Sequence, residues 1–148
     1  MKVNISVKLI TVLMILISCQ NKINQKQALE NEINIKIAED IRSSISKMID
    51  GAGIISTGLP IPFSSLINSI ITKEKQDSLI IHPIRPYLKL KLDQLNIKEL
   101  EKINADKKER YKIVYETIVA NRNEIIQDIS KNIPFAKILI NGIINNHK

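Results

Sequence analysis

The sequence predicts an all-α protein, a small bundle of about four to five helices after an N-terminal export signal and a short polar linker. Three observations support this fold class. Apolar residues recur at three- and four-residue steps along most of the chain after residue 28. Capping patterns precede two of these stretches, at Asn96 and at Asp106. Finally, the one segment with alternating apolar residues has no partner strand elsewhere.

Residues 1–18 are typical of a secretory signal peptide. The first eight residues carry Lys2 and Lys8 and no acid, residues 9–17 are uncharged, and the first acidic residue is Glu30. This order matches a positive region followed by a short apolar region. The apolar run is shorter than the about 20 residues that a spanning helix needs. The segment therefore predicts export rather than a transmembrane anchor.

The apolar run ends in Leu16, Ile17, Ser18 and Cys19, and Cys19 is the single cysteine. This arrangement resembles the lipobox of bacterial lipoproteins. The resemblance implies that diacylglycerol is attached to the thiol of Cys19, that the signal is cleaved before it, and that its new amino group is usually acylated, as with palmitate. The alternative is a secreted protein, or one with a buried core, whose cysteine is incidental.

Lipidation would fix the attachment of the mature chain, residues 19–148. Each buried methylene contributes about 0.8 kcal/mol, so one acyl chain binds marginally and two or three bind stably. The protein would then stay on a membrane without a transmembrane helix. No cysteine would remain for a disulfide, so packing alone must stabilise the fold.

Charge and composition limit the partners. Loss of Lys2 and Lys8 lowers the formal net charge from +7 to +5, which favours polyanionic glycans, anionic lipids or acidic proteins. Because lysines and glutamates interleave, a solvated helical surface is the stronger interpretation. Aromatic residues are 3% and tryptophan is absent, so we expect no nucleic acid partner. A candidate basic binding patch consists of Lys107, Lys108, Arg110 and Lys112.

The first part of the mature chain predicts a linker and a helix. Residues 20–27 are polar and form either a tether that lifts the domain off the membrane or the first turns of the next helix. A single helical domain is expected over 28–148. In residues 28–49 the four-residue spacing predicts an amphipathic helix, with Asp40 among the residues on other faces and an end at Asp50–Gly51. Its apolar stripe is Leu29, Ile33, Ile37, Ile41, Ile45, Met48 and Ile49.

The middle of the chain contains most of the breaks. Residues 51–62 are uncharged and hold three of the four glycines and two of the five prolines. They are expected to form a partly buried connection, or alternatively part of an apolar ligand surface. A second helical segment is expected from Phe63, with Ser64 as its cap. Pro83 and Pro86 predict a kink or turn, because neither suits a regular helix interior.

Three more helices are expected beyond these prolines. Residues 87–95 favour a helix, although the alternation of Leu88, Leu90 and Leu92 allows a short strand. Asn96 and Glu99 predict a capping box that opens a helix to about Ile103, with Leu95 packing on Leu100. Asp106 and Glu109 repeat that spacing, and the longest helix is expected from there to about Ser130.

Two features of the C-terminal part need separate interpretation. Arg122 interrupts the apolar stripe of the long helix, which is Tyr111, Val114, Tyr115, Ile118, Ile125 and Ile129. It is expected either to extend its head to solvent or to pair with Glu39 or another acid. Residues 132–148 predict a final helix restarted around Pro134 and central to the packing, with Phe135, Ile138, Leu139 and Ile143 facing inward.

The sequence contains no recognisable catalytic or cofactor motif. His82 and His147 have no third ligand at metal spacing, and no Gly-x-Ser-x-Gly motif is present. We therefore predict no catalytic residues, no metal and no cofactor, and a protein that is not an enzyme.

The lipobox, the polar linker, the small helical domain and the Ile/Lys/Asn-rich composition together resemble the plasmid-borne surface lipoproteins of Borrelia-type spirochaetes, with the small helical OrfD-type lipoproteins nearest. The resemblance implies an outer-membrane surface antigen that faces the cell exterior and binds a host protein or a polyanionic glycan. Gln20 stands where many Gram-negative lipoproteins retained in the inner membrane carry aspartate, a rule that spirochaetes need not follow. The alternative is a structural or plasmid- or phage-derived envelope lipoprotein with no host ligand.

Overall fold

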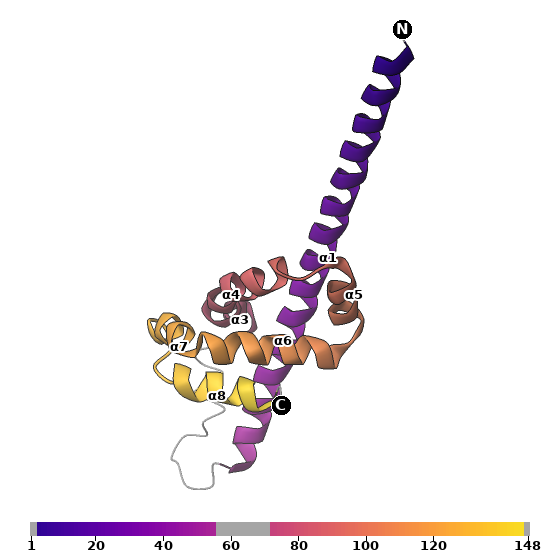
Figure 1. Ribbon diagram of the computed structural model, residues 1–148. Coiled ribbons are helices and arrows are strands. Elements are labelled where there is room, and N and C mark those ends of the chain that lie inside the picture. The colour runs from indigo at the N-terminus through magenta and orange to yellow at the C-terminus, as the bar shows by residue number, and fades with distance from the viewer. Residues whose placement is uncertain (1–2, 56–71, 147–148) are drawn as a thin grey trace.

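The computed structural model describes residues 3–55 and 72–146 (Figure 1). These residues form helices and no strand, so the protein is all-α, as predicted. In chain order the elements are α1 (Val3–Ile55), α3 (Lys73–Gln76), the π-helix η1 (Asp77–Ile81), α4 (His82–Asp93), α5 (Ile97–Ala105), α6 (Lys107–Ala120), α7 (Arg122–Ser130) and α8 (Ala136–Asn146).

Helix α1 is the axis of the molecule. Its C-terminal part packs against α5, α6, α8 and η1, while its N-terminal part projects away from this body (Figure 1). The predicted stripe of α1 is confirmed where side chains are described, because Leu29 and Met48 pack partly buried against the core and four isoleucines are 1% exposed or less. These are Ile33, Ile37, Ile41 and Ile45.

The expected end of this helix at Asp50–Gly51 is wrong. α1 continues through Gly51 to Ile55, and no described glycine adopts a positive φ. A glycine inside a helix costs only about 1 kcal/mol relative to alanine, so it need not end one. Residues 20–27 are also α-helical, which agrees with the alternative that they are turns of the same helix. Residues 56–62 and the helix expected from Phe63 lie outside the described residues.

Of the expected kink or turn at the prolines, the turn is not formed, because the chain stays helical from Lys73 to Asp93. Pro83 lies in the first turn of α4, and Pro86 lies inside the helix. The irregularity is instead η1, whose wider turns directly precede α4. The strand alternative for residues 87–95 is excluded, because Leu88 and Leu92 are buried on one face of α4.

Helix α5 begins as the sequence predicts. The Asn96 side chain accepts a hydrogen bond from the backbone N–H of Glu99 at 3.1 Å, and the Glu99 carboxylate accepts one from the backbone N–H of Asn96 at 2.8 Å. Leu100 is fully buried, and Leu95 packs against the same core. The reciprocal bonds satisfy two donors that a helix start leaves free.

The expected long helix to Ser130 is two helices. Asn121, at φ −121° and ψ 29°, separates α6 from α7 and donates its side-chain amide to the Thr117 carbonyl. An asparagine that bonds the backbone locally competes with helix continuation. Asp106 caps α6 through the N–H of Lys108, but Glu109 pairs with Lys102 rather than closing a capping box. The inner stripe is nevertheless buried at Val114, Ile118, Ile125 and Ile129.

Helix α8 packs against α1, α6 and α7 and contributes much of the core. Leu139 and Ile143 are buried as predicted, whereas Ile138 is 55% exposed and faces away from the body. The inward face is instead Ala136, Leu139, Ile140, Ile143 and Ile144. Phe135, which precedes the helix, is partly buried.

Candidate functional site

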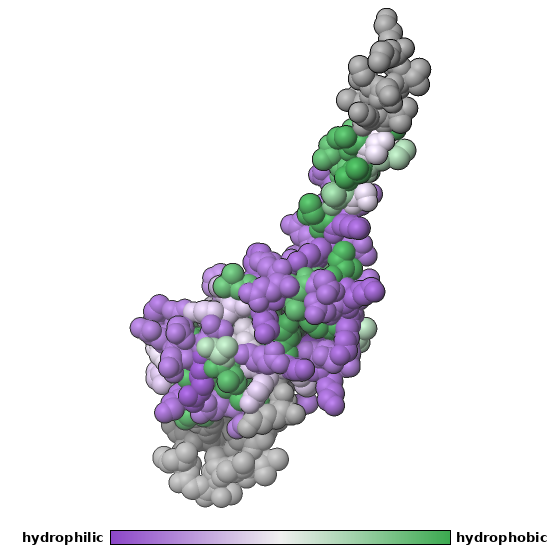
Figure 2. Space-filling view, viewed as in Figure 1, coloured by the Kyte–Doolittle hydropathy of each residue, from purple (hydrophilic) through white to green (hydrophobic). Residues whose placement is uncertain are grey.

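The projecting part of α1 carries the predicted lipidation motif. Leu16, Ile17, Ser18 and Cys19 are all exposed. Every large apolar residue from Ile10 to Ile17 is more than half exposed, and Figure 2 shows this apolar stretch above the hydrophilic body. Within the described ranges, no helix combines the length and apolar character that crossing a membrane requires.

The body begins where α1 first meets another element. The Lys26 ammonium donates to the Asp93 carbonyl at 2.8 Å, and Leu29 is the first residue of α1 that packs on the core. Between Cys19 and Lys26 the helix is exposed. The motif residues therefore lie on a helical extension of the body rather than in its core.

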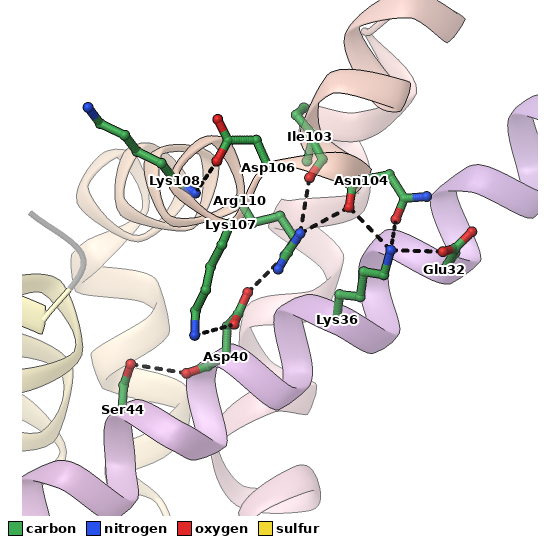
Figure 3. A network of polar contacts seen from close by, with 10 residues as sticks. All are labelled: Glu32, Lys36, Asp40, Ser44, Ile103, Asn104, Asp106, Lys107, Lys108 and Arg110. Atoms are coloured by element: carbon green, nitrogen blue, oxygen red, sulfur yellow. Dashed lines mark hydrogen bonds and ion pairs between the residues drawn. The ribbon is translucent and has the colours of Figure 1, made fainter.

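The four residues of the predicted basic patch do not share one role. Arg110 points inward, and its side chain is only 11% exposed. Its guanidinium donates to Asp40 at 2.8 Å and to the carbonyls of Ile103 and Asn104 (Figure 3). Asp40 is 6% exposed, so its expected placement on a solvent face is wrong. This buried pair joins α1 to α6.

Lys107 extends the same network, whereas Lys108 and Lys112 lie outside it. The Lys107 ammonium is 3.5 Å from the Asp40 carboxylate and 5.3 Å from the Tyr111 ring centroid. Hydrogen bonding with Tyr111, and then the charges of Tyr111 and Asp40, raise the pKa of Lys107 above its usual value. Lys108 and Lys112 are exposed and make no ion pair within the described residues. They are the cations of the patch available to a ligand.

A second cluster fixes α1 to the end of α5. The Lys36 ammonium bonds the Asn104 side chain at 2.7 Å, the Asn104 carbonyl at 3.2 Å and Glu32 at 2.8 Å (Figure 3). The hydrogen bond from Lys36, followed by that from Asn104, lowers the pKa of Glu32. Because Lys36 bonds Asn104 on α5, this cluster holds α1 and α5 together.

Lys112 also lines a groove of about 280 Å³, here called the α5–α6 groove. Leu95, Ile103 and Ile113 form its apolar part. Its charged residues are Lys91, Lys102, Lys112, Glu99, Glu109 and Glu116. Two ion pairs, Lys102–Glu109 at 2.6 Å and Lys91–Glu116 at 3.4 Å, occupy four of these charges. Hydrogen bonding to Glu109 raises the pKa of Lys102.

The remaining polar side chains do not form a site for a metal. Among the residues that the structure describes, no three His, Cys, Asp or Glu side chains gather as metal ligands. His82 is exposed at the start of α4, and His147 lies outside the described residues. Arg122 donates to the Asn141 side chain at 2.7 Å, and the expected pairing with Glu39 is not formed.

No family model, curated protein or solved structure matches this chain. The geometry itself shows two features that the sequence did not reveal. The first is Asp40 as the partner of Arg110, 70 residues away. Its position three residues after Ile37 and one before Ile41, beside the apolar stripe, is the sequence signal from which burial could have been predicted. The second is a groove between α1 and α4, which no local pattern in the sequence indicates.

Proposed function

We propose that the protein is a lipid-anchored lipoprotein of the bacterial outer surface, attached through acyl chains on Cys19, which binds a host macromolecule and is not an enzyme. The observation that carries the proposal is the position of Cys19. It follows an apolar, exposed run on the projecting part of α1, where modifying and cleaving enzymes reach it without unfolding the body.

The helical path after Cys19 supports display of the body above a membrane. An α-helix rises 1.5 Å per residue, so the segment from Cys19 to Lys26 spans about 10 Å. That length is close to the Debye length of about 8 Å at physiological salt. Anchored in this way, the body would present its side surfaces to the medium.

The binding role is supported by the surface of the body. Lys108 and Lys112 are exposed without ion-pair partners among the described residues, and Lys112 borders the α5–α6 groove. Cations at such positions attract acidic groups of proteins or of polyanionic glycans.

Lipidation is tested by labelling cells with radioactive palmitate. We expect label in the wild-type protein and none in Cys19→Ala, which should also leave the detergent phase on partition. Ser18→Ala is the matched control, because alanine keeps a small residue before the cysteine and should retain the label. Label in Cys19→Ala, or an unlabelled wild-type protein, would contradict the anchor.

Surface display and binding are tested separately. Protease added to intact cells should digest a protein that faces the exterior, whereas a periplasmic protein would survive and favour the structural envelope role. Host binding is tested by capture from serum with the full chain in detergent. Replacing Lys108 and Lys112 by glutamate should reduce capture at least tenfold. Lys98→Glu combined with Lys137→Glu, an equal charge change at exposed sites on α5 and α8, should leave capture unchanged.

A further inference from the structure

A second groove lies between α1 and α4, on residues that play no part in the basic patch. It holds about 360 Å³ and is lined by Asn31, Asn34, Ile35, Ala38, Arg42 and Arg85. Five of these residues lie along one stripe of α1, because each is three or four positions from another member of the set. From Asn31 to Arg42 this stripe is about 16 Å long, the length of about five extended residues.

Asn34, which lines the groove, carries an unsatisfied polar atom. Its side-chain oxygen is buried and accepts no hydrogen bond from the residues that the structure describes. Buried acceptors almost always have a donor, so an exception needs an explanation. Because an amide offers both a carbonyl oxygen and an NH₂ group, Asn34 can bond both the N–H and the C=O of a peptide unit once its side chain turns toward one.

Of the two arginines that line the groove, Arg85 makes no hydrogen bond or ion pair with the residues that the structure describes. Arg42 is bound to Asp77 by two hydrogen bonds of 2.8 and 2.7 Å, which raise its pKa. The charge of Glu39 also raises the pKa of Arg42. Arg85 is exposed and interacts with Asp77 only through space. Its guanidinium is therefore able to take a carboxylate in the forked geometry that Arg42 already shows with Asp77.

The groove also has an exposed apolar residue, Ile35. Ile35 is 62% exposed although it stands beside the buried Ala38. A ligand that covers it gains apolar burial of about 25 cal/mol per Å². Sulfated glycans and lipid headgroups carry anions, but they lack the combination of a carboxylate, an amide N–H and an apolar side chain.

We propose that the α1–α4 groove binds a short acidic segment of a partner protein, with Arg85 on a carboxylate, Asn34 on the adjoining peptide unit and Ile35 against an apolar side chain. The inference rests on the proposed binding function and names its partner class. It does not depend on how the protein is anchored, so a negative palmitate result leaves it standing.

The test uses the full chain in detergent micelles and an array of capped hexapeptides that place Glu or Asp beside Ile or Leu. We expect binding to a subset of these peptides, at least tenfold weaker when their acids become Gln or Asn. Arg85→Ala should weaken binding at least tenfold, and Arg85→Lys should retain part of it. Lys137→Ala, at an exposed site on α8 outside both grooves, is the control and should bind like wild type.

Asn34→Ala separates recognition from folding. It removes the buried unpaired oxygen, so the midpoint of urea unfolding should stay the same or rise, while peptide binding falls about fivefold or more. The proposal is overturned if no acidic peptide binds, if Arg85→Ala binds peptides as wild type does, or if heparin binds in an Arg85-dependent way while the peptides do not.

Discussion

The pair of Asp40 and Arg110 is a buried polar contact that joins α1 to α6. Removing one partner of a buried ion pair costs about 3 kcal/mol or more when the other charge is left without compensation. Because Lys107 remains 3.5 Å from Asp40, Arg110→Met, which keeps the apolar stem, should lower the free energy of unfolding by about 2 kcal/mol, measured by urea denaturation and circular dichroism. Lys108→Met, two positions away and exposed, should change it by less than about 0.5 kcal/mol.

A double variant distinguishes loss of charge from loss of packing. Combining Asp40→Leu with Arg110→Met removes both charges and should recover most of the loss, because apolar replacements of buried pairs are often neutral. If the double variant is less stable than Arg110→Met alone, the pair does not act as a buried charge pair.

The pair of Asp77 and Arg42 predicts an acid-sensitive contribution to stability. The hydrogen bond from Arg42 lowers the pKa of Asp77 below its ordinary 3.8. The folded state therefore prefers the carboxylate, and this contribution is complete above about pH 4 and is lost as the pH falls through the lowered pKa. Both side chains are over a third exposed, so the effect should stay below about 1 kcal/mol.

Asp77→Asn is the measurement that isolates this effect. Unfolding in urea at pH 6 should show the variant to be less stable than wild type, and the difference should shrink toward zero near pH 2. A difference that is the same at both pH values would show that the carboxylate charge has no part in it.

At the scale of elements, Gly142 sets how closely α8 approaches α1. A Cβ at this position would lie within 2.5 Å of the Met48 sulfur. Alanine is favoured over glycine in a helix by about 1 kcal/mol, so the two effects oppose each other. In a Met48→Ala background, Gly142→Ala should stabilise the protein by about 1 kcal/mol, whereas with Met48 present the gain should be smaller or reversed.

This coupling is checked by a double-mutant cycle in urea. The cycle should yield an interaction energy of about 0.5 kcal/mol or more between the two positions. Additive effects of Gly142→Ala and Met48→Ala would show that the Met48 side chain moves aside without cost. The close approach of the two positions would then not contribute to the free energy of unfolding.

The elements that were predictable are those with local chemical signals. The capping box at Asn96 and the isoleucine stripe of α1 depend only on residues three to five apart. The end of α1, the path through Pro83 and Pro86, and the break at Asn121 were not predictable. Gly51, Pro83 and Pro86 have a general tendency to break helices and yet lie inside one. Asn121 does break a helix, through a hydrogen bond to the Thr117 carbonyl.

At the scale of the whole molecule, the candidate sites also differ in whether local sequence was enough to predict them. The predicted lipobox lies on a continuous stretch of sequence, so the sequence alone was enough to propose all its residues. The basic patch was selected as a continuous stretch too, yet Arg110 turns inward because Asp40 approaches from a helix 70 residues earlier. The α1–α4 groove joins Asn34 to Arg85, and only the packing of the body brings such residues together.

The independence of the body from the projecting helix gives a final prediction. Residues 10–25 are exposed throughout, and the first contact with another element is made by Lys26. A chain that begins at residue 26 should therefore unfold in urea with the same midpoint and cooperativity as the full chain. Asn24→Pro should leave the midpoint of the full chain unchanged, whereas Ala38→Pro, inside the packed part of α1, should unfold the body, because proline within a helix costs about 3 kcal/mol or more. If Asn24→Pro lowers the midpoint as Ala38→Pro does, the projecting segment belongs to the cooperative unit and the display of Cys19 on an independent extension is wrong.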